Sequence, residues 1–425
     1  MKTYNISRTG ETIYCEKLKN GFTTYVIPSK NKNNYYAVLG VRYGAFDIEF
    51  IPLGSSDYYK SNYGVAHFLE HQAFEMNNEE NPMSFFAKSG VCSNASTGFL
   101  STKYYIWGTE EFNKNLDYLL TFVFSPYFTK ENIKQELGII NEEIRMYEDN
   151  PNWILDGTAR KMIYNELPVL EKIAGSCETV AKISPKELKI CYDTFYVPNN
   201  MFLIVSGNVD ENCVFDIVKN HKILNNLKPN YDIKRKEYQE KASVNEEYKL
   251  LKANVCIPKL KYIFKFARKQ FSMKEDYKLE MYFNLLIAIL FGSTSEFYEK
   301  IRSENIVSAY YVDHSNYGNS YILEFSVDSE YADIFKDLVD EYIKNIKIKE
   351  EDFIRMKRVW IASEIRMSDS PDMQAENLLD DLINYNKIFP NRIEMINEMN
   401  MKELNKLIKE LDFSNSCFVL MNPKD

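Results

Sequence analysis

Two of the four histidines in the chain lie four residues apart, in the segment from Gly64 to Glu75. Positions i and i+4 share one face of a helix, so His67 and His71 can direct both imidazoles at one ion. Glu70 shares that face. Neutral imidazoles suit zinc, and a carboxylate outside the coordination shell can take a proton from an attacking water. Chance alone would produce this His-x-x-Glu-His order about 0.005 times in such a chain, so it predicts a hydrolytic zinc site.

A tetrahedral zinc site needs a third protein ligand and keeps its fourth position for water. The expected helix Lys130–Glu148 offers four glutamates: Glu136, Glu142, Glu143 and Glu148. Apolar residues at spacings of three and four mark its buried face. At about 100° per residue, Glu136 and Glu143 flank that face, whereas Glu142 points almost directly away. The pattern therefore favours one ligand and one supporting carboxylate from Glu136 and Glu143. We expect Glu142 and Glu148 to be solvated.

Small residues lie between these two expected helices, at Gly90–Thr97, and the strand-like run Ser101–Trp107 follows them. Small residues in a strand let another backbone approach closely, and an edge strand can bind an extended peptide through main-chain hydrogen bonds. A strand of this kind is more commonly only a packed strand or hairpin. At this point both interpretations stay open.

The helices that carry these side chains are expected to pack on β-strands, and a polar linker is expected to follow them. Alternating apolar and polar residues at Phe22–Ile27 and Tyr36–Tyr43 predict a β-hairpin across the polar break 29–33. A short apolar strand is expected at Met201–Val205. The charge-rich stretch 226–247 has no amphipathic period of useful length and is typical of a linker. Helices and strands are mixed rather than strictly alternating, which favours an α+β fold.

The order of elements before the linker recurs after it. The later copy comprises strands and helices at Tyr262–Phe266, Met281–Leu290, Thr294–Arg302, Ala309–Val312 and Tyr321–Val327. The similarity lies in the order of elements rather than in residue identity, and it predicts a duplicated domain. We therefore expect two α/β-sandwich domains at 1–225 and 248–425, each a mixed or antiparallel sheet with helices packed on it, joined by the polar linker 226–247.

Composition limits the class of protein. The 425 residues suffice for about two or three domains, and 52 Lys and Arg against 61 Asp and Glu give a net charge of −9. Such an acidic chain is a poor candidate for nucleic-acid binding. Seven scattered cysteines form no CxxC pair and indicate no disulfide framework. The polar N-terminus and the short apolar runs lead us to expect a cytoplasmic protein without a membrane partner.

Several of these motifs together resemble the pitrilysin/insulysin/mitochondrial processing peptidase family. The segments that carry the resemblance are Gly64–His71, 93–97 with Tyr104 and Tyr105, Glu136 with Glu143, 173–176, 195–201 and 207–210. The similarity is continuous from about residue 20 to residue 210 and is thinner after the linker. The chain resembles the short, two-domain members of the family, such as the processing-peptidase subunits and their bacterial homologues.

The resemblance implies one zinc ion per chain, held by three ligands: His67, His71 and Glu143. It implies Glu70 as the general base and Glu136 as the carboxylate behind the ligands. It also implies that a peptide substrate docks on the strand that contains Asn94, Ala95 and Ser96. The family position of the zinc site agrees with the helix faces inferred from the residues themselves.

In this family, the half without zinc contributes an arginine and a tyrosine that contact the substrate carbonyl and the transition state. Arg302 and Tyr310 match these positions, although the gap between them is one residue longer than usual. An exposed helix arginine and a strand tyrosine are the alternative interpretation. The glycine-rich loop of the non-catalytic processing subunit has no counterpart here, which indicates the catalytic type of subunit. The other histidines, His221 and His314, match no motif and are expected to be structural or on the surface.

The sequence therefore predicts a zinc-dependent endopeptidase that cleaves peptides or small unfolded polypeptides inside a closed chamber. We expect it to act as the catalytic subunit of a homodimer, or of a heterodimer with a degenerate paralogous subunit. A structural or binding subunit that keeps the fold without turnover is the alternative, and the intact set of two histidines and two glutamates argues against it. A third possibility is a catalytic subunit that is silent until it is paired.

Overall fold

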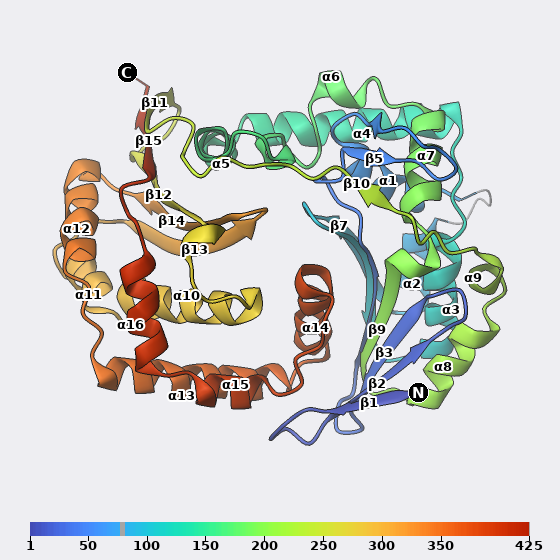
Figure 1. Cartoon of the computed structure of the whole chain (residues 1–425). Helices are drawn as coiled ribbons and strands as arrows, with labels where there is room; N and C mark the ends of the chain where they lie inside the picture. Colours follow the sequence, from blue (N-terminus) through green and yellow to red (C-terminus); the bar gives the residue numbers. More distant parts are fainter. Residues whose placement is uncertain (77–80, 425) are drawn as a thin grey trace. The chain divides into compact units, whose positions relative to one another are not determined.

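The computed structural model describes residues 1–76 and 81–424, and Figure 1 shows their helices and strands. The chain forms two compact units, each made of three segments. The first contains Met1–Arg145, Glu171–Lys236 and Ser363–Glu394. The second contains Met146–Leu170, Glu237–Ala362 and Met395–Asp425. Within the described ranges, none of the helices combines the length and hydrophobicity that crossing a membrane would demand.

A seven-stranded sheet with the order β1-β2-β3-β9-β4-β8-β7 forms the centre of the first unit. Its strands are β1 Lys2–Asn5, β2 Thr12–Lys17, β3 Thr23–Pro28, β4 Tyr35–Val41, β7 Cys92–Thr97, β8 Thr102–Gly108 and β9 Met201–Gly207. Only β3 and β9 pair in parallel, and the other neighbours are antiparallel. β4 and β9 are buried at every position, as expected of central strands covered on both faces. A small second sheet has the order β10-β5-β6, with Lys234–Arg235, Glu49–Ile51 and Tyr59–Lys60.

The predicted hairpin between 22–27 and 36–43 is wrong. Both segments form strands, β3 and β4, but β9 lies between them, parallel to β3 and antiparallel to β4. The polar residues 29–33 are therefore a loop between strands that are not neighbours. A local turn pattern could not show that a wholly buried strand from much later in the chain would pair with both.

Helices cover both faces of the first sheet. Alternate residues of one strand belong to opposite cores: Leu203 packs with the core of α1 and α3, and Ile204 with the core of α14. The helices of this unit include α1 Val65–Ala73, α2 Pro82–Lys88, α3 Phe112–Val123, α6 Cys177–Val180, α7 Pro185–Phe195, α8 Glu211–Asn220, α9 Lys222–Asn226 and α14 Pro371–Tyr385. Figure 1 shows α3 and α8 on one face of this sheet and α14 on the other. Helix α4, Lys130–Glu148, lies almost wholly within the same unit.

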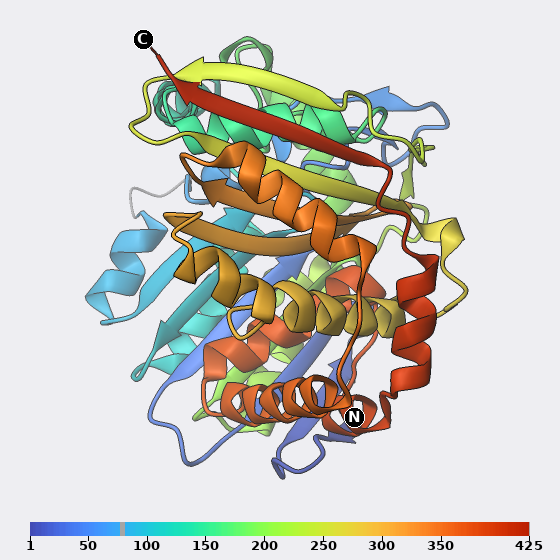
Figure 2. The same ribbon diagram turned by 90° about the vertical axis from the view of Figure 1, so that its left-hand side faces the viewer.

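The second unit contains a five-stranded sheet with the order β11-β15-β12-β14-β13. The strands are β11 Tyr248–Ala253, β12 Lys259–Ala267, β13 Ala309–Tyr317, β14 Ser320–Asp328 and β15 Ser416–Pro423. One face packs against α10 Asp276–Phe291, α11 Glu296–Ser303, α12 Ala332–Lys344 and α16 Met401–Glu410. Figure 2 shows α12, in orange, crossing this sheet. Helix α5, Pro151–Ile163, also contacts β12 and β15. Two further helices are α13, Glu350–Met367, and α15, Arg392–Glu398.

The two sheets share one topology. In chain order, β3, β4, β7, β8 and β9 correspond to β11, β12, β13, β14 and β15. β9 pairs in parallel with β3 and antiparallel with β4, and β15 pairs in the same way with β11 and β12. The expected α+β fold with two duplicated sandwich domains is therefore confirmed.

Each compact unit contains one helix that comes from the other half of the chain. Helix α5 comes early in the chain but belongs to the second unit, and α14 comes late but belongs to the first. The expected domains 1–225 and 248–425 are continuous segments of the chain, and these boundaries stay a prediction. The expected linker 226–247 contains β10 and also Glu240, whose carboxylate pairs with Lys265 of β12 at 2.7 Å with both side chains fully buried.

Candidate metal centre

Helix α1 is held rigidly by its N-terminus and its apolar face. Gly64 precedes it with φ of 93°, and a Cβ there would lie 2.6 Å from the carbonyl oxygen of Ala174. Only glycine accepts both the left-handed conformation and this close approach. Phe68 and Leu69 then bury the helix in the core of the first unit. The histidine-bearing face is thereby fixed relative to the sheet.

Helix α4 presents its glutamates to different surroundings. Ile133, Ile140 and Ile144 form its buried stripe. The side chains of Glu136 and Glu143 beside this stripe are 10% and 23% exposed. The Glu142 side chain is 73% exposed and forms an ion pair with Arg145. The periodicity of the helix therefore separates Glu143 from its neighbour in the way that the sequence predicts.

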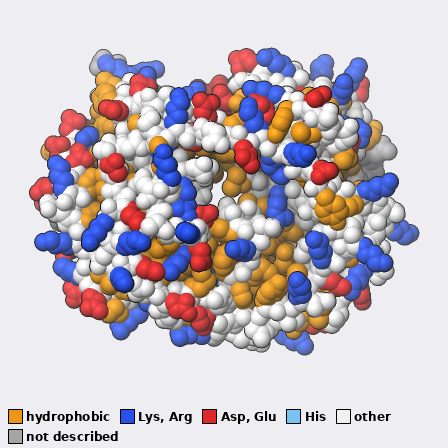
Figure 3. Space-filling model, viewed as in Figure 1, with side chains coloured by type: hydrophobic (Ala, Val, Ile, Leu, Met, Phe, Trp, Pro, Cys, Tyr) orange, Lys and Arg blue, Asp and Glu red, His pale blue; other side chains and the backbone are white. Residues whose placement is uncertain are grey.

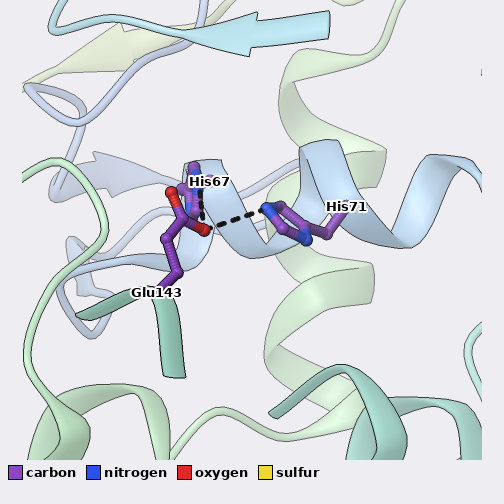
Figure 4. Close-up of side chains that lie close together, drawn as sticks. All are labelled: His67, His71 and Glu143. Atoms are coloured by element: carbon purple, nitrogen blue, oxygen red, sulfur yellow. Dashed lines mark ion pairs between the residues drawn. The ribbon is translucent and has the colours of Figure 1, made fainter. Parts of the chain in front are cut away.

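Three donor atoms converge between these helices. Oε2 of Glu143 lies 3.7 Å from Nε2 of His67 and 3.5 Å from Nε2 of His71, and all three ligand atoms lie within 4.8 Å of one another. Figure 4 shows the carboxylate of Glu143 directed at both imidazoles. Tetrahedral zinc with bonds near 2.05 Å would separate its ligand atoms by about 3.3 Å. The donor types and their spacing therefore fit one zinc ion.

Glu136 holds one of these imidazoles from behind. Its Oε1 lies 2.6 Å from Nδ1 of His71. A protonated Nδ1 that donates to this carboxylate leaves Nε2 unprotonated on the side of Glu143, the arrangement usual for a metal-ligating histidine. Burial by itself would lower the pKa of His71, but its hydrogen bonds to Glu136 and Glu143 outweigh burial and raise this pKa to about 9. Without a metal the ring therefore carries both protons at physiological pH, and zinc would displace the proton on Nε2.

His67 lies in a different electrostatic environment. Its side chain is nearly buried, and burial together with the neighbouring His71 lowers the pKa of His67 to about 4. The imidazole is therefore neutral at physiological pH, and a metal ligand must be neutral. The two rings meet edge to face with centroids 4.5 Å apart.

Glu70 stands beside the three donors. It is 8% exposed, and burial raises its pKa, whereas the hydroxyl of Thr97 donates to its Oε2 at 2.5 Å and opposes that rise. Thr97 comes from the end of β7, and its role was not inferred from the sequence. Nothing local to its segment signals this contact, because the partner lies on α1.

Strand β7 forms one edge of the first sheet and pairs only with β8 among the described strands. Asn94 is exposed, Ala95 faces the core and Ser96 is half-buried. The side-chain oxygen of Asn94 accepts a hydrogen bond from the N–H of Ala95 at 2.9 Å. The edge expected to dock a peptide is therefore present, and a side chain already occupies one of its backbone donors.

Arg302 and Tyr310 belong to the second unit. Arg302 is exposed on α11. The hydroxyl of Tyr310 donates to the carbonyl of Phe291 at 2.9 Å, and its ring packs near Phe297 and Phe325. The contacts of Tyr310 are those of a core residue, whereas its neighbour Tyr311 is exposed. A catalytic role for Arg302 and Tyr310 stays a prediction.

The two remaining histidines have local contacts. His221 is buried, accepts the N–H of Leu224 at the start of α9, and lies 3.1 Å from the hydroxyl of Thr121. This is a helix-capping role. His314 is half-buried on β13, with Nε2 3.8 Å from a carboxylate oxygen of Glu280.

Comparison with known proteins agrees with this geometry. The profile of the family described as insulinase (peptidase family M16) matches residues 50–175, and that of the peptidase M16 inactive domain matches residues 182–359. The uncharacterized zinc protease YmfH of Bacillus subtilis is 37% identical over 308 residues, which cover 72% of each chain. The beta subunit of the mitochondrial-processing peptidase of Caenorhabditis elegans is 26% identical over 48% of this chain and 43% of its own.

Among solved structures, a protein of Alicyclobacillus acidocaldarius described as an M16-like peptidase has the same fold. It superposes with a TM-score of 0.89 at 26% identity and covers 97% of this chain and 99% of its own. The duplicated fold, the pair of histidines and the similarity to YmfH lead to one conclusion. The chain belongs to the insulinase (M16) family of zinc peptidases.

Proposed function

We propose that this protein is a zinc-dependent endopeptidase that cleaves peptides or small unfolded polypeptides. The convergence of His67, His71 and Glu143 within 4.8 Å, with Glu70 beside them, carries this proposal. Two neutral imidazoles and a carboxylate are the ligand set of a catalytic zinc site that keeps one position open. A buried carboxylate next to such ligands suits a proton-transfer role.

His67, His71 and Glu143 would hold one zinc ion per chain. When bound, zinc polarises the scissile carbonyl and lowers the pKa of water. Glu70 takes the proton of the attacking water and passes it to the leaving amine, and Thr97 keeps its carboxylate in place. Glu136 orients His71 through the Nδ1 hydrogen bond, as supporting carboxylates do at zinc sites.

Substrate docking is proposed for the edge strand β7. An extended peptide can pair with the free edge at Asn94, Ala95 and Ser96 and present its scissile bond beside Glu70, because Thr97 of the same strand contacts that carboxylate. Docking at Ala95 requires the Asn94 side chain to release the N–H that it occupies. Arg302 and Tyr310 are proposed as substrate contacts only on their match to the family positions.

The proposed assembly is a closed chamber in which this chain is the catalytic subunit of a homodimer or of a heterodimer with a degenerate paralogue. The similarity to a protein named as a subunit of the mitochondrial-processing peptidase supports pairing. Positive and negative side chains are interspersed over the face in Figure 3, which fits a peptide rather than a nucleic-acid partner. We place the protein in the cytoplasm because its seven cysteines are free thiols.

One experiment tests the function. The zinc content of the purified protein is measured by elemental mass spectrometry, and its activity is measured as cleavage of a peptide library. Both assays are run on the protein alone and on its mixture with a paralogue encoded nearby. The Glu70→Gln variant should bind zinc and lose cleavage; full activity in that variant would refute the mechanism. Zinc binding without cleavage under either condition would instead support the alternative, a binding subunit that keeps the peptidase fold.

A further inference from the structure

A cavity of about 70 Å³ lies in the first unit, away from the candidate zinc site. Its walls come from Ile13 of β2, Ile27 of β3, Leu378 of α14 and the segments 6–11 and 388–393. Helix α14 covers the sheet face opposite to α1. Strands β3 and β7 are four strand spacings apart, about 19 Å. The cavity is therefore separate from the peptidase chemistry.

Apolar walls surround an unbalanced set of charges. Glu11, Glu364 and Asp381 line the cavity, and Arg392 is the cationic residue among its lining. Arg392 already forms an ion pair with Asp381. Glu11 accepts a hydrogen bond from the Gln374 amide at 2.7 Å, which supplies no full charge. Three carboxylates therefore share the charge of one arginine within the lining.

Glu364 is the carboxylate most available to a ligand. It is half-buried, it makes no hydrogen bond or ion pair among the described residues, and the nearby charge of Arg392 only partly offsets the effect of its burial. Burial raises the pKa of both Glu364 and Glu11, and it raises that of Asp381 to about 6 despite the charge of Arg392. A cation in the cavity would stabilise the charged carboxylates that burial disfavours.

The dimensions and chemistry select the class of ligand. A water-sized group needs about 10–15 Å³ of such space, so the cavity holds about five to seven non-hydrogen atoms. Among the described residues, its carboxylates do not form a group with the ligand spacing of a metal site. The apolar walls favour a carbon body over a bare ion.

We propose that this cavity binds a small organic cation, an ammonium or guanidinium group on a short apolar chain, with Glu364 and Glu11 receiving the cationic end. The same chemistry is offered by a free amine and by a lysine or arginine side chain of a peptide. The proposal is independent of the peptidase activity, because the cavity and the zinc ligands share no residue.

Titration calorimetry of the full chain at constant ionic strength tests the proposal. The probes are n-butylamine and n-propylguanidine, with n-butanol and butyrate as neutral and anionic controls of similar size. Saturable 1:1 binding of the cations alone is expected. Glu364→Gln should weaken it at least about tenfold, because a charged contact is lost. Asp57→Asn removes an exposed carboxylate outside the lining and should leave it unchanged.

The outcomes are distinct. Equal binding of n-butanol and n-butylamine would overturn the proposal, since the cavity would then recognise only apolar surface. Equal effects of Glu364→Gln and Asp57→Asn, with no effect of Glu11→Gln, would also overturn it. Binding of Nα-acetyl-lysine amide as well as n-butylamine would support a peptide side chain as ligand, and binding of n-butylamine alone would support a free amine. Zinc content should be unchanged in all variants.

Discussion

Nδ1 of His71 lies 2.6 Å from Oε1 of Glu136, a residue that is 65 positions later in the chain. This hydrogen bond joins α1 to α4 and fixes which imidazole nitrogen faces Glu143. The site thus depends on the relative placement of two helices, and each helix alone carries only part of it.

Removal of the Glu136 carboxylate should weaken zinc binding about 10–100-fold, because His71 loses the acceptor that orients it. Glu136→Gln should be milder than Glu136→Ala, since the amide oxygen can still accept the Nδ1–H. Competition with a fluorescent chelator measures the affinity. Glu131→Ala, on the exposed part of α4, is the matched control. An equal loss in this control would contradict the assignment.

Adjacent glutamates should behave oppositely. Glu143→Ala should abolish stoichiometric zinc, because a ligand atom is removed, whereas Glu142→Ala should retain it, because that side chain is exposed and paired with Arg145. Metal analysis after dialysis reports both, and circular dichroism shows whether each variant is folded. Similar zinc contents in the two variants would refute the helix-face assignment.

Thr97→Val should lower kcat about tenfold or more while zinc content stays unchanged. The substitution keeps the shape of the side chain but removes a hydrogen bond to the Glu70 carboxylate, and bonds to charged groups contribute about 1.5–3 kcal/mol. Steady-state cleavage of one library peptide measures the effect. Thr12→Val, on the distant strand β2, should leave kcat as it is.

Chelation should both inactivate and destabilise the protein. A ligand that binds only the folded state stabilises it by about 2.7 kcal/mol at 100 times its Kd, so metal removal should lower Tm. Scanning calorimetry before and after treatment with a chelator measures the shift. Added zinc should restore both Tm and cleavage. In Glu143→Ala the chelator should leave Tm unchanged, and a shift of the original size there would place the metal elsewhere.

Gln72→Met should stabilise the fold by about 1–3 kcal/mol. Gln72 follows His71 on α1, is fully buried, and among the described residues its side-chain nitrogen and oxygen have no hydrogen-bond partner. Methionine has a similar volume and no strongly polar atom to bury. Urea unfolding should show a higher midpoint with an unchanged slope. A lower midpoint would show that the amide is satisfied in solution.

The sequence by itself determined the parts of the site that belong to single helices. The i, i+4 spacing placed His67 and His71 on one face of α1, and the apolar stripe of α4 distinguished Glu143 from Glu142. The order of elements also predicted the duplicated α+β fold. Helical periodicity is a local property, so the amino-acid sequence alone specifies it.

Only the tertiary structure decided the pairings between distant segments. It placed β9 between β3 and β4, brought Thr97 to Glu70, and assigned α5 and α14 to the sheets of the opposite chain halves. The pattern of an amphipathic helix or an apolar strand indicates that the element is buried, but it does not indicate which other element packs against it. That choice depends on the free energy of packing the whole chain, which no local pattern contains.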